Sequence, residues 1–353
     1  MEKILTILIV SIILIALIAF TAGLTVVKVV FKKTFASFKY DPYVAIARYD
    51  FYENELHREL VNFESGKNIL QGYFYKGKNK DSVTNNKLIV FSHGIWSGHE
   101  DYMTLLKWFI DHGMSVFAYD YTAYNNSKGY SAKGLPQSML DLNCALDFIE
   151  KDKELSKYEI CLLGHSWGAY ASTAVLKFKH NISKVVAMSG FDSPLEISMS
   201  TASKLLGTQS ALLKPFVKAE NKRIFGKQAN VKATDSINSS EVPVLIIHGA
   251  GDKFIEYDKT ALIAKKDEIT NPNVSYYTIN KEKIDNHNSY INNVEAATYI
   301  EEIVADFKEL EKQYGKEGVP KDVKDKFFED IDRNKSNQAN VELCQRIYDF
   351  IIV

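Results

Sequence analysis

Short apolar runs alternate with amphipathic segments along most of the chain. Six of the runs are apolar on both faces: "KLIVFSH" (87–93), "SVFAYDY" (115–121), "EICLLG" (159–164), "KVVAMSG" (184–190), "PVLIIHG" (243–249) and "VSYYTI" (274–279). Strands of this kind belong to a parallel sheet that helices cover on both sides. The pattern therefore predicts an α/β protein with a doubly wound, mostly parallel sheet.

Other segments complete this prediction. The stretch "VNFESGKNILQGYFYKG" (61–77) contains two alternating runs around a turn and indicates an N-terminal antiparallel hairpin. Helical spacing of apolar residues predicts helices near 100–112, 136–152, 167–179, 256–269 and 291–312. The long interval at 191–241 has helical periodicity and no strand pattern, so we expect a small helical lid there.

The N-terminal segment 4–27 is apolar and contains no charged residue, and it is long enough to span a bilayer as a helix. A cleaved signal peptide is the alternative, but "AFTAG" is a poor cleavage site because Phe20 lies three residues before Gly23. We expect an anchor over 1–30 and a linker over 31–60. The remaining predicted divisions are a catalytic domain at 61–312 and a helical extension at 313–353, where "VELCQRIYDFIIV" should dock as an amphipathic helix.

Lysines flank this apolar segment unequally. Lys28, Lys32, Lys33 and Lys39 follow it, whereas Lys3 and the terminal amine precede it. The positive-inside rule favours a cytoplasmic domain, with the extracellular side left open.

Composition excludes several classes of function. The chain is 46% hydrophobic and 25% charged, as in globular proteins, and its net charge of −1 gives no reason to expect a nucleic-acid partner. Its three cysteines, Cys144, Cys161 and Cys344, are far apart and form no cluster with histidine. We therefore expect neither a zinc site nor a disulfide framework.

Ser166 lies in "GHSWG", between Gly164 and Gly168, where an apolar strand is followed directly by a small-residue helix. Gly-x-Ser-x-Gly in this context is typical of a nucleophile elbow, in which glycines allow the strand and the helix to approach closely. The alternative is a tight turn that happens to contain a serine.

A serine nucleophile needs a base and an acid that orients the base. His287 in "KIDNHNSYI" follows the last strand, and Asp252 in "IIHGAGDKFI" follows the preceding one, which fits the order Ser, Asp, His. Asp120 is the rival acid, although it precedes Ser166 and is better suited to organising its own loop. We expect His165 to point away from Ser166.

An oxyanion needs hydrogen-bond donors, and the backbone amide of Trp167 is next to the proposed nucleophile. The turn at His93 and Gly94 makes the amide of Ile95 the second candidate. The candidates for a substrate pocket are Trp96, Tyr102, Met199 and Phe216.

The segments "SHGIWSGHEDY", "FAYDYTAYNNSKG", "GHSWGAY", "PVLIIHGAGDKFI" and "NHNSY" together resemble the α/β-hydrolase superfamily over about residues 60–312. The nearest branch groups serine aminopeptidase-like hydrolases, monoacylglycerol lipase-like enzymes and small esterases. The resemblance implies a serine hydrolase that forms an acyl-enzyme, with Ser166, Asp252 and His287 at the matching positions. The chain departs from the family at 122–125, where Thr-Ala-Tyr-Asn replaces the usual Arg-Gly-x-Gly.

The sequence thus predicts a membrane-anchored serine hydrolase that cleaves a carboxylic ester without a metal or organic cofactor. A lipid-derived ester is one candidate for the substrate. An aminopeptidase or amidase is an alternative, in which an acidic patch such as Glu196 and Glu220 would bind a free amine. A non-catalytic binding module with the same fold is a further alternative.

Overall fold

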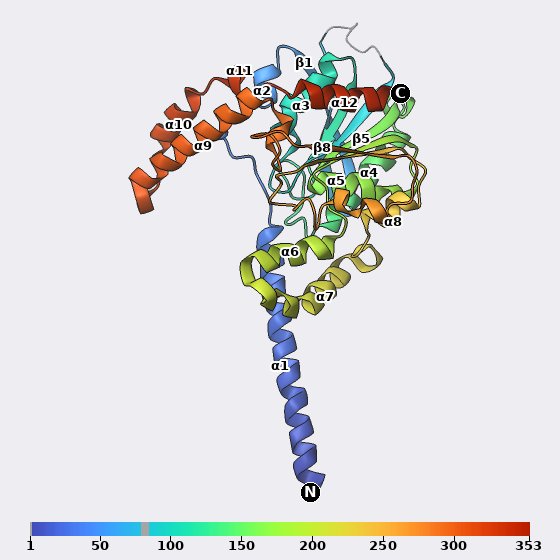
Figure 1. Cartoon of the computed structure of the whole chain (residues 1–353), viewed down its shortest axis with the longest axis vertical. Coiled ribbons are helices and arrows are strands. Elements are labelled where there is room, and N and C mark those ends of the chain that lie inside the picture. Colours follow the sequence, from blue (N-terminus) through green and yellow to red (C-terminus); the bar gives the residue numbers. More distant parts are fainter. Residues whose placement is uncertain (1, 79–84) are drawn as a thin grey trace.

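The computed structural model describes residues 2–78 and 85–353, and its centre is one eight-stranded sheet with the order β1-β2-β4-β3-β5-β6-β7-β8 (Figure 1). The strands are β1 (Leu56–Ser65), β2 (Asn68–Gly77), β3 (Lys87–Ser92), β4 (Ser115–Tyr119), β5 (Glu159–His165), β6 (Ile182–Met188), β7 (Val244–Gly249) and β8 (Val274–Ile279). The β1–β2 hairpin joins β4 in antiparallel orientation, and the other strand pairs are parallel. The predicted sheet and hairpin are confirmed.

Each face of the sheet has its own apolar core. Leu88 and Val90 of β3 belong to one cluster, whereas Ile89 and Phe91 belong to the other, as the alternation of side chains along a strand requires. The first cluster is covered by α4 (Pro136–Lys151), α5 (Trp167–Ala174) with η4 (Val175–Phe178), and α8 (Ala233–Asn238). The second is covered by η2 (His99–Tyr102), α3 (Met103–Asp111) and α12 (Val341–Ile352).

The predicted helix at 256–269 is wrong. Turns occupy residues 253–260, and a 3-10 helix, η7 (Leu262–Glu268), follows. The amide of Leu262 donates to the carbonyl of Gly190 at 2.8 Å, and Ala261 forms a bridge with Phe191. These long-range backbone hydrogen bonds replace the local bonds that an α-helix would need.

The predicted helical insertion consists of α6 (Pro194–Leu206), η5 (Gly207–Leu213), α7 (Lys214–Phe225), η6 (Gly226–Gln228) and α8. It begins at Ser193, whose hydroxyl caps α6 by accepting the amide of Glu196 at 3.4 Å. It returns to the sheet beside α5, where the Tyr170 hydroxyl donates to the carbonyl of Val231 at 3.0 Å. The insertion is helical, as the periodicity predicts.

The N-terminal helix α1 (Glu2–Thr34) projects from the body of the molecule (Figure 1). Its stretch Lys3–Thr34 is long and apolar enough to span a membrane, and none of its most apolar window is buried; an N-terminal signal sequence would have the same character. The other end of the helix enters the first core cluster through Val27 and Phe31, and Phe35 follows them there. The helix therefore extends into the segment predicted as a linker.

The C-terminal part of the chain folds back onto the sheet. It contains α9 (Val294–Tyr314), η9 (Gly315–Glu317), α10 (Lys321–Glu329), α11 (Arg333–Ser336) and α12. Leu343, Cys344, Ile347 and Ile351 of α12 are buried in the second core cluster. The predicted docking of this terminal helix is confirmed. Between α1 and β1 the chain forms one short helix, α2 (Tyr49–Tyr52).

The hydrogen bond of Tyr170 yields a test of how the insertion is held. Tyr170→Phe leaves the buried carbonyl of Val231 without its donor, which should lower the free energy of unfolding by about 1–2 kcal/mol. Tyr130→Phe is the matched control, because the Tyr130 side chain is fully exposed. Chemical denaturation of both variants measures the difference, and equal stability would contradict this account.

Candidate active site

Ser166 lies at the turn between β5 and α5. Its backbone angles, φ 56° and ψ −113°, are ones that residues other than glycine rarely adopt. A β-carbon at Gly168 would lie 1.9 Å from the carbonyl oxygen of Ser92, and one at Gly164 would lie 2.2 Å from that of Gly168. Both obstacles are backbone atoms, so only glycine allows β3, β5 and α5 to approach this closely. The predicted elbow is present.

His287 lies in the loop after β8 and contacts two of the predicted residues. Its Nε2 is 2.9 Å from the Ser166 hydroxyl, and its Nδ1 is 2.7 Å from Oδ2 of Asp252. In the tautomer that this geometry favours, Nδ1–H donates to the carboxylate and Nε2 accepts from the serine. Ser166 and His287 are 121 positions apart in sequence.

Asp252 is buried and fully hydrogen-bonded. Its Oδ1 accepts the amides of Phe254 and Ile255 at 2.8 and 2.9 Å, and its Oδ2 also lies 3.0 Å from Nε2 of His248. Burial by itself raises the pKa of Asp252, but hydrogen bonds from His248 and His287 outweigh it and hold the pKa well below its ordinary value. The carboxylate therefore stays charged at neutral pH.

His248 is the residue that sequence reasoning missed. It belongs to the apolar run 243–249, whose pattern predicts only a strand, yet its ring lies beside the Asp252 carboxylate. The four-residue spacing in "HGAGD" was an available signal, because a tight turn after a strand returns the chain to the end of that strand.

Asp120 lies in a separate buried network. Its Oδ1 accepts the amide and Nδ1–H of His99, both at 3.0 Å, and Nε2 of His99 lies 2.9 Å from the Tyr75 hydroxyl. No hydrogen bond or ion pair joins Asp120 to His287 in the described parts of the chain. Among the described residues, the Asp120 carboxylate bonds to His99 and Tyr40 and to no residue of its own loop at 121–134. The expectation that it organises its own loop is therefore wrong.

His165 points away from Ser166 and connects two loops. The carbonyl of His287 can only accept, so Nε2–H of His165 donates to it at 2.9 Å. Nδ1 of the neutral ring therefore accepts from the Tyr102 hydroxyl, 2.8 Å away, and that hydroxyl in turn accepts the amide of Gly94 at 3.1 Å. Burial lowers the pKa of His165 to about 3, so the ring remains neutral.

Two backbone amides near Ser166 remain available to an anion. Trp167 is the first residue of α5, and Ile95 follows Gly94, whose Cα lies close enough that an added β-carbon would be 3.6 Å from the Ser166 β-carbon. Within residues 85–353 and 2–78, neither amide donates to a protein acceptor. The Trp167 side chain itself is buried, with Nε1 donating to the carbonyl of Leu135 at 2.7 Å.

Ser166 and His287 line a cavity of about 820 Å³, hereafter the Ser166 pocket. Its apolar lining consists of Phe38, Val44, Ile46, Ile95, Trp96, Phe254, Ile291 and Ile300. Charged lining residues are Asp41, Arg48, Asp101 and Glu301. Of the predicted pocket residues, Trp96 and Tyr102 line it.

Met199 and Phe216 do not line the Ser166 pocket, and their prediction is wrong. Met199 lines a different cavity within the insertion, and the Phe216 ring packs on Phe20 of α1 with the ring centroids 5.3 Å apart. The physical reason is that the insertion leans on α1 instead of covering Ser166. Segment 38–48 and part of α9 cover the pocket in its place.

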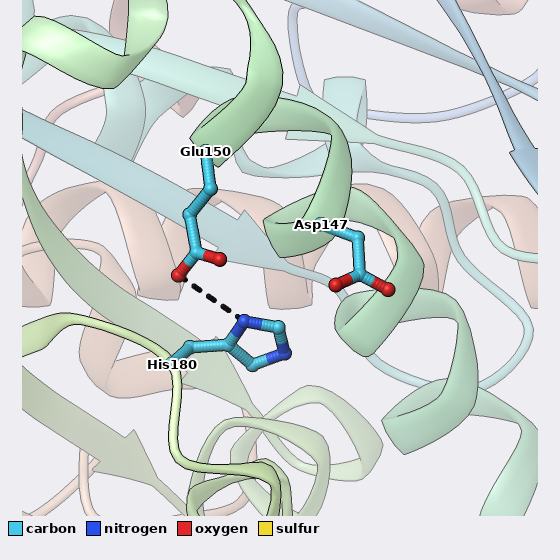
Figure 2. A group of neighbouring side chains, drawn as sticks. All are labelled: Asp147, Glu150 and His180. Carbon is cyan, nitrogen blue, oxygen red and sulfur yellow. Dashed lines mark hydrogen bonds and ion pairs between the residues drawn. The ribbon is translucent and has the colours of Figure 1, made fainter.

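A group of possible metal ligands lies on the outside of α4 (Figure 2). Ligand atoms of Asp147, Glu150 and His180 lie within 4.8 Å of one another. Both ring nitrogens of His180 already have partners, at 3.2 Å to Glu150 and 3.1 Å to Asn143. The group lies apart from the Ser166 pocket, none of whose lining residues belongs to it.

Comparison with known proteins agrees with this fold. Residues 84–236 match the family model of the serine aminopeptidase, S33. The esterase Pf2001 of Pyrococcus furiosus has a TM-score of 0.55 at 18% identity, over 78% of this chain and 98% of that chain. An acylaminoacyl peptidase in complex with Z-Gly-Gly-Phe-chloromethyl ketone has a TM-score of 0.50 at 17% identity, over 72% and 41% of the two chains. No curated protein sequence matches.

The chain has the fold of the α/β-hydrolases, and its central residues 84–236 are similar to the serine aminopeptidase family.

The low pKa of His165 gives the stability of the protein a predictable pH dependence. In the unfolded chain the imidazole has its ordinary pKa of 6.5, so on acidification the unfolded state binds a proton that the folded state excludes. Stability contributed by this residue is complete above the unfolded pKa and should fall by about 2 kcal/mol between roughly pH 8 and pH 5.

In His165→Gln this loss should disappear, so the difference in unfolding free energy between the variant and the unmodified protein should shrink on acidification. His57→Gln, at an exposed position of β1, is the control and should follow the unmodified protein. Denaturation curves at the two pH values test the prediction, and parallel pH profiles for His165→Gln would refute it.

Proposed function

We propose that the chain is a membrane-anchored esterase in which Ser166, His287 and Asp252 form the catalytic triad. The Ser166 oxygen attacks the ester carbonyl while Nε2 of His287 takes its proton, and Asp252 stabilises the imidazolium that forms. The amides of Ile95 and Trp167 bind the oxyanion. The alcohol leaves with the proton from His287, and a water molecule then releases the acid and regenerates the serine.

The observation that carries this proposal is the continuous hydrogen-bonded chain from Ser166 through His287 to Asp252, with distances of 2.9 and 2.7 Å. It lies at the wall of a cavity large enough for a small organic substrate. A non-catalytic binding module with this fold would not need the hydrogen bonds that join Ser166, His287 and Asp252. Catalysis is therefore favoured over the non-catalytic alternative.

The surroundings of the Ser166 pocket favour an ester with a medium-length or lipid-derived acyl group. Most of the surface that lines it is apolar. The exposed Trp96 ring at its edge donates from Nε1 to the carbonyl of Thr34, the last residue of α1. The pocket is thus adjacent to the end of the proposed anchor. Substrates that partition into a membrane would reach it over a short path.

The aminopeptidase alternative loses the acidic patch that was expected to bind an amine. Glu196 lies 3.5 Å from Lys265, Glu220 is paired with Arg223, and neither lines the Ser166 pocket. Asp41 and Glu301 are the exposed carboxylates in the lining, and they are the groups that a free amine would meet. Aminoacyl anilides assayed beside esters would measure their effect.

Contacts of α1 support an anchor over a cleaved signal peptide. Phe20 packs on Phe216, and Val27, Phe31 and Phe35 are buried in the core, so α1 and the domain share one packed interface. Removal of the helix near residue 23 would expose the part of α7 that it covers. The lysines after the span favour placing the domain in the cytoplasm.

Ser166→Ala tests the proposed nucleophile. It should abolish fluorophosphonate labelling and lower the turnover of p-nitrophenyl esters by at least about 10,000-fold, because triad residues act as a unit. Ser156→Ala, at an exposed position remote from the pocket, is the matched control and should keep full activity. Labelling that persists in the Ser166 variant would overturn the assignment.

Asp252→Asn and Asp120→Asn together identify the acid. Asp252→Asn should lower kcat by roughly 1,000- to 10,000-fold, because an amide favours the wrong tautomer of His287. Asp120→Asn weakens the His99 network and should lower stability, with kcat per folded molecule nearly unchanged. Dividing the rate by the amount of protein that the fluorophosphonate labels distinguishes a loss of kcat from a loss of folded protein. If Asp120→Asn lowered kcat more than Asp252→Asn, Asp120 would be the acid of the triad.

A further inference from the structure

The contact between α1 and α7 fixes the position of the insertion relative to a membrane. The Phe216 ring lies so close to Gly23 that a β-carbon there would be 2.6 Å from it, and it also packs on Phe20. Lys28 follows Phe20 by eight residues, about 12 Å along a helix. With the apolar span within a hydrocarbon core of about 30 Å, α7 lies at the boundary between lipid tails and headgroups.

A pocket opens between α1 and α7 at this level, with a volume of about 530 Å³. We name it the basic pocket; its lining is Lys28, Phe31, Lys32, Ser131, Lys133, Glu220, Arg223 and Ile224. Four of these residues are cationic and one is acidic. The pocket shares no residue with the Ser166 pocket.

The single carboxylate in the basic pocket is already neutralised. Glu220 is buried and accepts two hydrogen bonds from Arg223, at 2.7 Å from Nε and 2.6 Å from Nη2, which lower its pKa. This pairing uses two of the five guanidinium donors. Among the described residues, Lys28, Lys32 and Lys133 form no ion pair, so the pocket keeps an excess of positive charge.

Apolar side chains also protrude from the insertion, ahead of α7. Leu205 is 81% exposed, Leu206 is 51% exposed and Leu212 is 74% exposed, and all three lie where α6 passes into η5 ahead of α7. Figure 1 shows α6 and α7 beside α1 at the edge of the body from which the helix projects. Helical segments that expose leucines and also carry lysines are typical of a membrane interface.

From these observations we propose that the basic pocket binds the phosphate headgroup of an anionic membrane phospholipid. The lysines meet the phosphate at headgroup depth, and the neighbouring leucines contact the acyl chains, so one lipid would join the anchor to the insertion. This inference rests on the proposed anchor and is independent of the proposed chemistry at Ser166. The bound lipid would hold the insertion against the membrane beside the Ser166 pocket.

The test uses the full chain carrying Ser166→Ala, so that no lipid is hydrolysed, in a neutral detergent. Native mass spectrometry counts bound short-chain phosphatidylglycerol, with phosphatidylcholine and inorganic phosphate as comparison ligands. We expect phosphatidylglycerol to bind preferentially. Lys32→Gln combined with Lys133→Gln should weaken its binding by about tenfold or more, because each lysine near a lipid surface contributes a comparable attraction.

Lys151→Gln combined with Lys153→Gln is the control, because these two exposed lysines lie at and just after the C-terminal end of α4, outside the basic pocket. This double variant should bind phosphatidylglycerol as tightly as the chain that carries Ser166→Ala alone. Lys133→Glu alone, which leaves α1 unchanged, should reduce binding as well. Unfolding temperatures in phosphatidylcholine micelles check that the variants are folded.

If inorganic phosphate bound as tightly as phosphatidylglycerol, the ligand would be a soluble anion, and that result would overturn the proposal. So would equal binding of the two lipids, or unchanged binding in the Lys32 and Lys133 variant. An intact mass that lacks α1 would refute the anchor and this inference together, whereas fluorophosphonate labelling of Ser166 in the unmodified chain would still test the esterase separately.

Discussion

The close backbone approach at Ser166 is the constraint on which the rest of the structure depends. Ser92, Gly164 and Gly168 bring β3, β5 and α5 within van der Waals contact of one another, and the strained turn between them points the Ser166 hydroxyl outward. The same turn places the first amide of α5 beside that hydroxyl. One local conformation therefore supplies both the proposed nucleophile and one proposed oxyanion donor, at a conformational cost that the packed core must offset.

Neutral histidines hold the loops around this turn. His165 connects the Gly94 loop to the His287 loop through its two ring nitrogens. His93 is also buried, and burial lowers its pKa to about 4. Because an uncharged imidazole can donate from one side and accept on the other, these rings join loops in the interior without introducing a buried charge.

The N-terminal helix is integrated with the domain and does not merely precede it. Its end contributes Val27 and Phe31 to the core, and its apolar part is contacted by Phe216 of the insertion. The insertion consequently leans toward α1, and residues 38–48 cover the Ser166 pocket instead. In this chain the helical segment that was expected to cover the active site therefore lies beside α1, the proposed anchor.

Local pattern in the sequence determined the strands, the elbow, the helical character of the insertion and three widely spaced residues with the chemistry of a triad. These features depend on periodicity and turn chemistry, which neighbouring residues specify. Only the tertiary structure decided that 256–269 is not an α-helix, that His248 contacts Asp252, and that Met199 and Phe216 lie away from the pocket. Each of these features depends on which distant segment forms the hydrogen bond or packs on the apolar face. The residues of one segment do not specify that partner by themselves.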